Sequence, residues 1–340
     1  MPPRSTESLA VGVAGLGYIG TAVGTEFRNH PDASVTAVCD PNDDRLSAAG
    51  DLFDVDEAAR FRSYDRLIER APIDAVVIGT PHTLHYEQVI AALDASLHVY
   101  CDKPLTTDVA RAREIVNRDA RSDRTVMVGY QRRLQEPYRR ARERFRTSSP
   151  RWLSASITQD WIAEADGTWR LDPELSGGGF LYDTGSHVVD AVCFTSGLDP
   201  VSVVASMDFH DDETIDRRAH LDVEFAGGAT ASIACHGAVP AVREHLYGWD
   251  TDGAVCIDGR GWGARRFRRI DADGEYRPTL DPRTERTRAE AFVESVRSDV
   301  PPPATTRDGA VVTALIEAAY QAGRADGPKR VPVETDFGEP

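Results

Sequence analysis

The chain has 340 residues, of which 55 are acidic and 39 basic, so its formal net charge is −16. The length allows about two domains of ordinary size, and 41% hydrophobic with 28% charged residues is a folding composition. So acidic a chain lacks the excess of Lys and Arg that phosphate backbones and anionic lipid surfaces require. We therefore expect neither nucleic acid nor a membrane as a partner.

Lysine is almost absent from the basic residues. Only Lys103 and Lys329 are lysine, so 37 of the 39 basic residues are arginine. An acidic, lysine-poor surface stays hydrated in molar salt, where charge is screened within about 3 Å. We interpret this composition as a sign of a halophilic, salt-accumulating cytoplasm. A GC-rich genome, which replaces Lys by Arg, is the alternative interpretation.

The five cysteines are widely spaced and include no Cys-x-x-Cys pair. This pattern predicts neither a disulfide framework nor a zinc site, and we predict no metal site. The stretch 1–8 is short and polar, without a signal-peptide core, and no apolar run approaches ~18 residues. We expect a cytoplasmic protein with reduced thiols.

Strand and helix patterns alternate along the first part of the chain. The pattern predicts strands at 9–14, 34–39, 75–78, 98–101 and 125–128, and helices at 21–30, 64–70, 84–93 and 107–119. Such alternation favours a parallel, doubly wound α/β sheet. We assign residues 9–129 to a dinucleotide-binding Rossmann domain.

The pattern changes in the second part of the chain, 130–334. The segments 201–209, 219–225 and 229–235 alternate apolar with polar residues, which indicates half-buried antiparallel strands. Helices are predicted at 134–145, 182–196, 285–297 and 308–324. We therefore predict a second domain of the α+β class.

A glycine-rich loop follows the first predicted strand. Gly15 allows a tight turn, Gly17 allows a pyrophosphate to approach the backbone, and Gly20 allows close packing of helix on strand. Asp40 follows the second strand, where a carboxylate accepts hydrogen bonds from ribose hydroxyls and repels a 2′-phosphate. The loop predicts dinucleotide binding, with NAD favoured. NADP stays open, because Arg45 could stack on adenine or contact a 2′-phosphate; a solvated surface arginine is the other interpretation.

Two further segments carry candidate chemistry. Lys103 lies just past a strand's carboxyl end, which faces the ligand crevice of an open sheet. A lysine kept in so arginine-rich a chain indicates a task for a compact ammonium that arginine does not supply, and chance placement is the alternative. Asp183 and His187 follow three glycines and are four residues apart, so on a helix they share a face and can handle protons together. A helix cap for Asp183 and a core position for His187 are the alternatives.

The motifs together resemble one family. The glycine loop, Gly79-Thr80-Pro81-His82, Asp102-Lys103-Pro104, Gly129-Tyr130-Gln131-Arg132 and Gly177–His187 occur in the order typical of the glucose–fructose oxidoreductase and inositol dehydrogenase (Gfo/Idh/MocA) family. The resemblance covers nearly the whole chain. It implies a Rossmann domain followed by an open-faced, mostly antiparallel sheet with helices on one face, often used for homodimers or homotetramers.

The resemblance also assigns site residues. His82 and His85 do not suggest a metal site, since neither cysteine nor carboxylate joins them at suitable spacing. Asp102 replaces the family's glutamate with a shorter side chain at the position of the implied ribose contact. The implied cofactor-binding residues are Gly15, Gly17, Tyr18, Ile19, Gly20, Asp40, Arg45, Thr80, Pro81, His85, Asp102 and Gln131. The implied substrate-binding residues are Lys103, Arg132, Trp169, Arg170, Asp183 and His187, of which Lys103, Asp183 and His187 are also catalytic.

The primary functional hypothesis is hydride transfer between a nicotinamide cofactor and a hydroxyl carbon of a sugar, sugar acid or cyclitol. His187 would act as general base, Lys103 would stabilise the developing alkoxide, and Asp183 would orient His187 or bind substrate. One alternative is a glycosidase or epimerase that oxidises its substrate transiently. Another is a dinucleotide-binding regulator without turnover.

Overall fold

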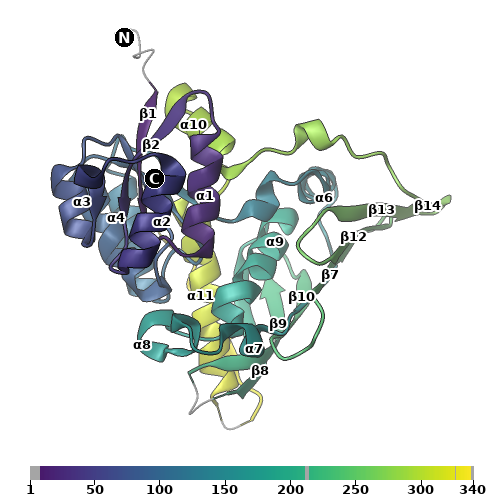
Figure 1. Ribbon diagram of the computed structural model, residues 1–340. Coiled ribbons are helices and arrows are strands. Elements are labelled where there is room, and N and C mark those ends of the chain that lie inside the picture. The colour runs from purple at the N-terminus through teal and green to yellow at the C-terminus, as the bar shows by residue number, and fades with distance from the viewer. Residues whose placement is uncertain (1–7, 211–213, 326, 338–340) are drawn as a thin grey trace.

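The computed structural model describes residues 8–210, 214–325 and 327–337, which build two sheets connected by helices (Figure 1). The polar stretch on which the expected absence of a leader depends lies, apart from Ser8, outside the described residues. In the described ranges, no helix combines the length and the apolar character needed to cross a bilayer.

The first sheet has six parallel strands in the order β3-β2-β1-β4-β5-β6. The order reverses between β1 and β4, which opens a crevice at the carboxyl ends of these strands. The predicted Rossmann fold is confirmed, and the structure adds α2 and the short β3. The strands are β1 (Leu9–Ala14), β2 (Ala33–Cys39), β3 (Arg60–Phe61), β4 (Ala75–Ile78), β5 (His98–Cys101) and β6 (Val126–Val128). The helices are α1 (Tyr18–Arg28), α2 (Asp43–Phe53), α3 (Tyr64–Arg70), α4 (His85–Asp94) and α5 (Val109–Asp119).

The second sheet has nine strands in the order β14-β13-β12-β11-β7-β10-β9-β8-β15, of which only β7 and β10 pair in parallel. The strands are β7 (Trp152–Thr158), β8 (Pro200–Phe209), β9 (Asp216–Phe225), β10 (Thr230–His236), β11 (Arg243–Trp249), β12 (Ala254–Arg260), β13 (Arg265–Asp271), β14 (Gly274–Tyr276) and β15 (Arg330–Pro332). The mostly antiparallel sheet is as expected, although the sequence predicted only β8, β9 and β10 by position.

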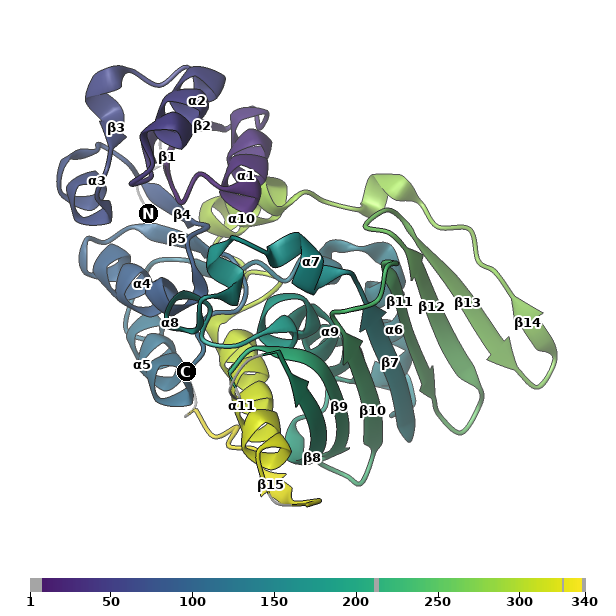
Figure 2. The same ribbon diagram turned by 60° about the horizontal axis from the view of Figure 1, so that its bottom comes forward.

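The helices of the second part are α6 (Glu136–Thr147), α7 (Trp161–Ala165), α8 (Pro173–Ser176), α9 (Ser186–Ser196), α10 (Arg288–Ser298) and α11 (Thr306–Gly323). Of these, α6, α9 and α11 pack on one side of this sheet, whereas α10 packs against α1 of the Rossmann part. Figure 1 shows α6 and α9 between the second sheet and the Rossmann sheet, and Figure 2 shows the strands side by side. The opposite face carries no helix in the described residues, so it is open.

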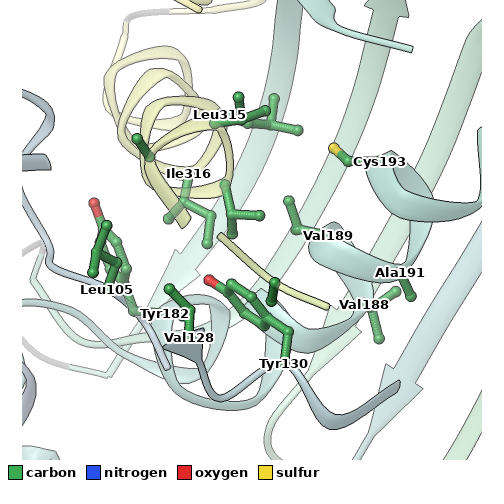
Figure 3. Packing of buried hydrophobic residues seen from close by; sticks show 14 of the residues in the cluster. Leu105, Val128, Tyr130, Tyr182, Val188, Val189, Ala191, Cys193, Leu315 and Ile316 are labelled. Atoms are coloured by element: carbon green, nitrogen blue, oxygen red, sulfur yellow. The ribbon is translucent and has the colours of Figure 1, made fainter. Parts of the chain in front are cut away.

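Two C-terminal helices join the sheets. The apolar face of α11 packs against Leu105, which follows β5, against Val128 of β6 and against Val189 of α9 (Figure 3). Helix α10 lies within the range predicted for the second domain, yet Phe292 packs edge-on against Phe27 of α1 with ring centroids 5.6 Å apart. The chain therefore returns to the Rossmann sheet after building the second one, which fixes the crevice between them.

Candidate active site

The glycine loop has the geometry that a dinucleotide needs. Gly15 has a φ of +82°, and a Cβ on Gly20 would lie 1.8 Å from the carbonyl oxygen of Gly15. A Cβ on Gly17 would meet nothing within 4 Å, so the space above the loop is open. Helix α1 begins there without a side-chain cap, so its first N–H groups are available to an anion. The residues of this loop fit the pyrophosphate of NAD or NADP.

Asp40 fastens this loop to the end of β2. Its carboxylate accepts hydrogen bonds from the backbone N–H groups of Leu16, at 2.8 Å, and Asn42, at 2.9 Å, and the residue is only 4% exposed. A ribose hydroxyl that binds Asp40, as predicted, therefore has to share the carboxylate with these two backbone N–H groups. Arg45 lies on α2 and lines a shallow pocket of about 480 Å³ next to Gly17, at the place predicted for the adenosine end.

The turns after β4 and β5 bring the next predicted residues to the crevice. His85 is fully buried, and its ring nitrogens lie 2.8 Å from the carbonyl oxygen of Pro104 and 3.0 Å from that of Thr80. It thereby ties the two strand ends together. Asp102 is buried beside it, and burial raises the pKa of its carboxyl group.

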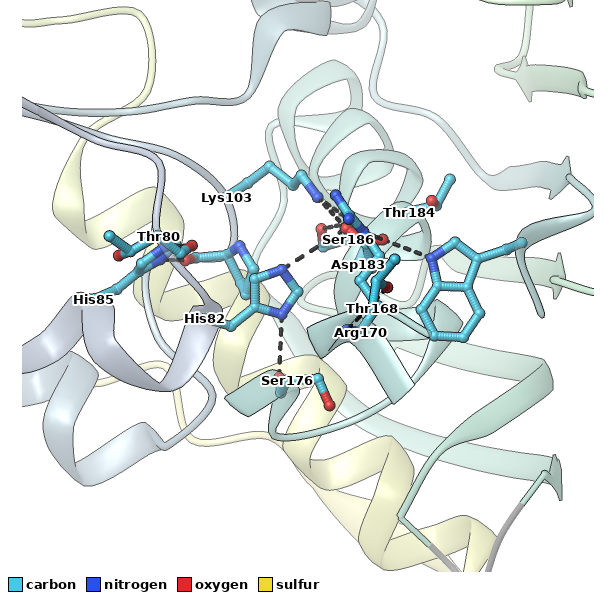
Figure 4. A network of polar contacts seen from close by, with 12 residues as sticks. Thr80, His82, His85, Lys103, Thr168, Arg170, Ser176, Asp183, Thr184 and Ser186 are labelled. Carbon is cyan, nitrogen blue, oxygen red and sulfur yellow. Dashed lines mark hydrogen bonds and ion pairs between the residues drawn. The ribbon is translucent and has the colours of Figure 1, made fainter. Parts of the chain in front are cut away.

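Lys103 and Asp183 form the centre of the site (Figure 4). The Nζ of Lys103 donates to Oδ1 of Asp183 at 2.6 Å and to its backbone oxygen at 2.7 Å. Oδ2 of Asp183 accepts from Nε1 of Trp161 at 2.6 Å and from Nε of Arg170 at 2.9 Å. Burial opposes ionisation of Asp183, but these cations hold its pKa well below the usual range. The carboxylate is therefore ionised and fully engaged.

His187 does not pair with Asp183 as the sequence predicted. Residues Leu181–Gly185 form a π-helical turn before α9, so the four-residue spacing no longer places the two side chains against each other. In the described part of the chain, Nδ1 of His187 is buried without a hydrogen-bond partner. Burial and the charges of Arg132 and Lys103 lower the pKa of His187 well below its usual value. The ring is therefore neutral.

Arg132 is not on the cleft surface. It is 1% exposed, and its guanidinium pairs with Glu244 in a two-point contact beneath the cleft. This pair occupies its Nε and one Nη, and Arg132 is not among the residues that line the cavity, so its predicted contact with substrate stays a prediction. Trp169 stacks edge-on against His82, with ring centroids 4.8 Å apart, and supports the guanidinium of Arg170.

Two residues of this network were not among the predicted site residues. His82 is 3% exposed; its Nδ1 lies 3.1 Å from the oxygen of Ser176 and its Nε2 lies 3.7 Å from Oδ1 of Asp183. Trp161 follows β7, which was not among the predicted strands although Leu153, Ala155 and Ile157 alternate there with polar residues. The motif Thr80-Pro81-His82 was a usable signal for the histidine, whereas the tryptophan reaches Asp183 only through tertiary packing.

These groups surround a cavity of about 590 Å³ between the two sheets. Its walls combine residues of the Rossmann crevice with residues of the second sheet and its connections. The lining includes Tyr18, Ile19, Asp102, Lys103, Gln131, Gln159, Trp161, Glu164, Arg170, Asp183, Thr184, His187, Trp262 and Arg288. The described residues contain no group of three or more metal-ligating side chains.

Comparison with known proteins identifies both parts of the chain. Residues 9–130 match the family model described as an oxidoreductase family with an NAD-binding Rossmann fold, and residues 139–251 match the GFO/IDH/MocA C-terminal domain. A D-xylose 1-dehydrogenase (NADP(+)) of Haloferax volcanii is 27% identical over 323 residues, covering 92% of this chain and 95% of that protein. A myo-inositol 2-dehydrogenase of Thermotoga maritima is 26% identical over 251 residues, or 71% of each chain.

Solved structures share the fold. The aldose–aldose oxidoreductase of Caulobacter crescentus, solved with glycerol, superposes with a TM-score of 0.82 at 23% identity, over 96% of this chain and 100% of that one. The WlbA dehydrogenase of Bordetella pertussis, solved with NADH and UDP-GlcNAcA, gives a TM-score of 0.82 at 20% identity, over 96% and 99% of the two chains.

Proposed function

Because the chain belongs to the Gfo/Idh/MocA family of oxidoreductases, we propose that it oxidises a secondary or anomeric hydroxyl of a sugar, sugar acid or cyclitol. NAD, when bound, supplies the acceptor for the hydride that leaves the carbinol carbon; NADP is the second candidate. The names of the relatives, which act on inositol and xylose, support this substrate class.

The observation that carries the proposal is the contact between Lys103 and Asp183. A lysine ammonium has three N–H donors, and two of those on Lys103 are held by the backbone and side-chain oxygens of Asp183. Because Lys103 also lines the cavity, its third N–H is left for the substrate oxygen. A donor fixed in advance at a developing alkoxide stabilises the transition state without having to reorganise.

His187 is the proposed general base. It lines the same cavity as Lys103, and its depressed pKa keeps it neutral near pH 7. A neutral imidazole accepts the hydroxyl proton as the hydride departs, which contributes typically 10²–10⁴-fold to the rate. Asp183 orients Lys103 and Arg170, because its carboxylate contacts both of them and not His187.

The cellular setting follows from the composition. Relatives from Haloferax volcanii and Haloarcula marismortui support a halophilic source for this chain. All five cysteines are free and buried, as a reducing cytoplasm would allow. The open face of the second sheet is the proposed surface for homodimers or homotetramers, since unpartnered sheet faces favour association.

The test is a screen for NAD and NADP reduction over pentoses, hexoses, sugar acids and inositols at high KCl, read by absorbance of the reduced nicotinamide. We expect accumulation of reduced cofactor with at least one compound. Lys103→Ala should lower kcat about 10²–10³-fold without changing cofactor affinity. Lys329→Ala is the matched control, because Lys329 is the other lysine of the chain and is exposed. Product formation without reduced cofactor would instead indicate transient oxidation, and unchanged turnover of Lys103→Ala would refute its assignment.

A further inference from the structure

Trp262 stands out among the five tryptophans of the chain. It lies at the tip of the hairpin between β12 and β13, is 48% exposed, and lines the cavity that contains Lys103 and His187. Tryptophan is enriched at binding surfaces, because its ring combines a large apolar face with a polar N–H group.

The other four tryptophans all have partners. Trp161 donates to Asp183, Trp169 packs against His82 and Arg170, and Trp152 and Trp249 stack on each other with centroids 4.3 Å apart. Trp262 has no ring or hydrogen-bond partner within the described ranges 8–210, 214–325 and 327–337. Its indole face is therefore available to a ligand.

The strand register explains why the hairpin reaches the cavity. Thr158, the last residue of β7, pairs with Arg243, the first residue of β11, and Arg243 pairs with Arg260, the last residue of β12. The turn 261–264 therefore leaves the sheet at the same end as the segment that runs from β7 to Trp161. Both segments contribute a tryptophan to the same cavity wall.

Hydrogen bonds of Arg265 hold the base of this hairpin in place. Arg265 is 6% exposed; its Nη1 donates to the carbonyl oxygen of Gly263 at 2.5 Å and its Nη2 donates to Oε2 of Glu244 at 2.9 Å. A Cβ at Gly259 would lie 2.7 Å from the Arg265 side chain, so glycine at that position lets the arginine cross β12. Glu244 in turn holds Arg132, the neighbour of cavity-lining Gln131.

The tip of the hairpin is not packed. Gly261 has a φ of +62°, which favours glycine, but a Cβ on either Gly261 or Gly263 would meet nothing within 4 Å. The two glycines therefore give the backbone on each side of Trp262 freedom to turn, while Arg265 keeps the tip over the cavity.

We propose that Trp262 is a specificity-determining residue whose indole face stacks on the carbon–hydrogen face of the substrate's sugar or cyclitol ring. The inference rests on the proposed function and names the part of the site that recognises a ring. A pyranose or cyclitol has one face of C–H bonds that packs on an aromatic ring, while its hydroxyl groups remain free to reach polar groups such as Lys103 and His187. Open-chain polyols lack such a face and gain less from this contact.

The experiment separates binding from turnover. Tryptophan fluorescence of the full-length protein is titrated without cofactor against every compound of the carbohydrate screen, with Trp262→Phe and Trp152→Phe compared with the unmodified chain. Trp152 is also exposed, at 43%, but does not line the cavity. We expect ring compounds to quench the unmodified protein and Trp152→Phe equally, and to quench Trp262→Phe much less, with only Trp161 left on the cavity lining.

Kinetics supply the second measurement. Trp262→Ala should raise KM about 3- to 10-fold with kcat nearly unchanged, because the stacking contact is the same in ground and transition states, and Trp262→Phe should restore most of the affinity. Quenching without oxidation of any compound would support the stacking role and reject the proposed dehydrogenase activity. Quenching as strong in Trp262→Phe as in the unmodified chain, no quenching by any compound, or a fall in kcat alone in Trp262→Ala would overturn the inference.

Discussion

Replacing Glu244 by glutamine should destabilise the protein strongly, although Glu244 is far from the cavity surface. Its side chain is 2% exposed and accepts from Arg132 at 2.6 and 2.5 Å, from Arg265 at 2.9 Å and from the Tyr138 hydroxyl at 2.5 Å. A neutral amide leaves two buried guanidinium groups without their shared carboxylate. The loss of one partner of a buried pair typically costs 3–5 kcal/mol.

The pKa of Glu244 gives an independent magnitude. Burial opposes ionisation, but Arg132 and then Arg265 lower its pKa from 4.5 to about 2. At about 1.4 kcal/mol per pKa unit, this difference corresponds to roughly 3 kcal/mol of stability. Because the folded-state pKa is depressed, this stability is present above pH 4.5 and is lost as the pH falls from 4.5 towards 2. Both routes therefore give a cost within about 3–5 kcal/mol.

The measurement is thermal unfolding at fixed KCl. With an unfolding entropy of about 2.1 cal/mol/K per residue over the whole chain, Glu244→Gln should lower Tm by roughly 4–7 °C. Glu143→Gln is the control, since Glu143 is an exposed carboxylate on α6 and such substitutions change stability by only about 0.5 kcal/mol. If the two variants melt together at neutral pH, the buried network does not stabilise the fold and the reasoning fails.

Three further predictions concern the base, the solvent and the assembly. His187→Asn should lower kcat/KM about 10²–10⁴-fold, and the unmodified enzyme should keep its kcat/KM as the pH falls to 6.5; an acid limb above that pH contradicts the depressed pKa of His187. Tm should rise from low to molar KCl, because salt screens repulsion within a chain of net charge −16, and a Tm indifferent to KCl contradicts the halophilic interpretation. Trp152→Asp should dissociate the oligomer in light scattering, because Trp152 is exposed on the open face; a monomeric unmodified protein would contradict the proposed surface.

The Rossmann half was predictable because its signals are local. The strand Leu9–Ala14, the glycine spacing and Asp40 stand in one short stretch, and the apolar runs of β4 and β5 are buried along nearly their whole length. The second sheet was harder to predict. β13 contains four arginines in seven residues and shows no apolar alternation, so its sequence does not resemble that of a half-buried strand. Arg265 is nevertheless buried in this strand, because Glu244 on β11 pairs with its charge. A pattern in one strand cannot show a partner in another.

The sequence indicated residues that line one cavity, but it did not indicate the contacts between them. Lys103, Asp183 and His187 do line one cavity. The expected pairing of Asp183 with His187 assumed a regular α-helix, whereas the π-helical turn Leu181–Gly185 directs Asp183 to Lys103, Trp161 and Arg170. Helical spacing is a safe guide to neighbours only where the turn is regular.

The structure gives a reason why lysine is present at position 103 of a chain in which nearly all other cations are arginine. Elsewhere in the site and beneath it, arginines make two-point or planar contacts: Arg132 with Glu244, Arg170 over Trp169. Lys103 has a different task, because its single nitrogen must serve the backbone oxygen and Oδ1 of Asp183 at once and still present a donor to the cavity. A compact ammonium directs three N–H bonds from one point, whereas a guanidinium spreads its donors across a rigid plane. Replacement of lysine by arginine can therefore proceed over the surface of such a chain, but the geometry around Asp183 opposes it at position 103.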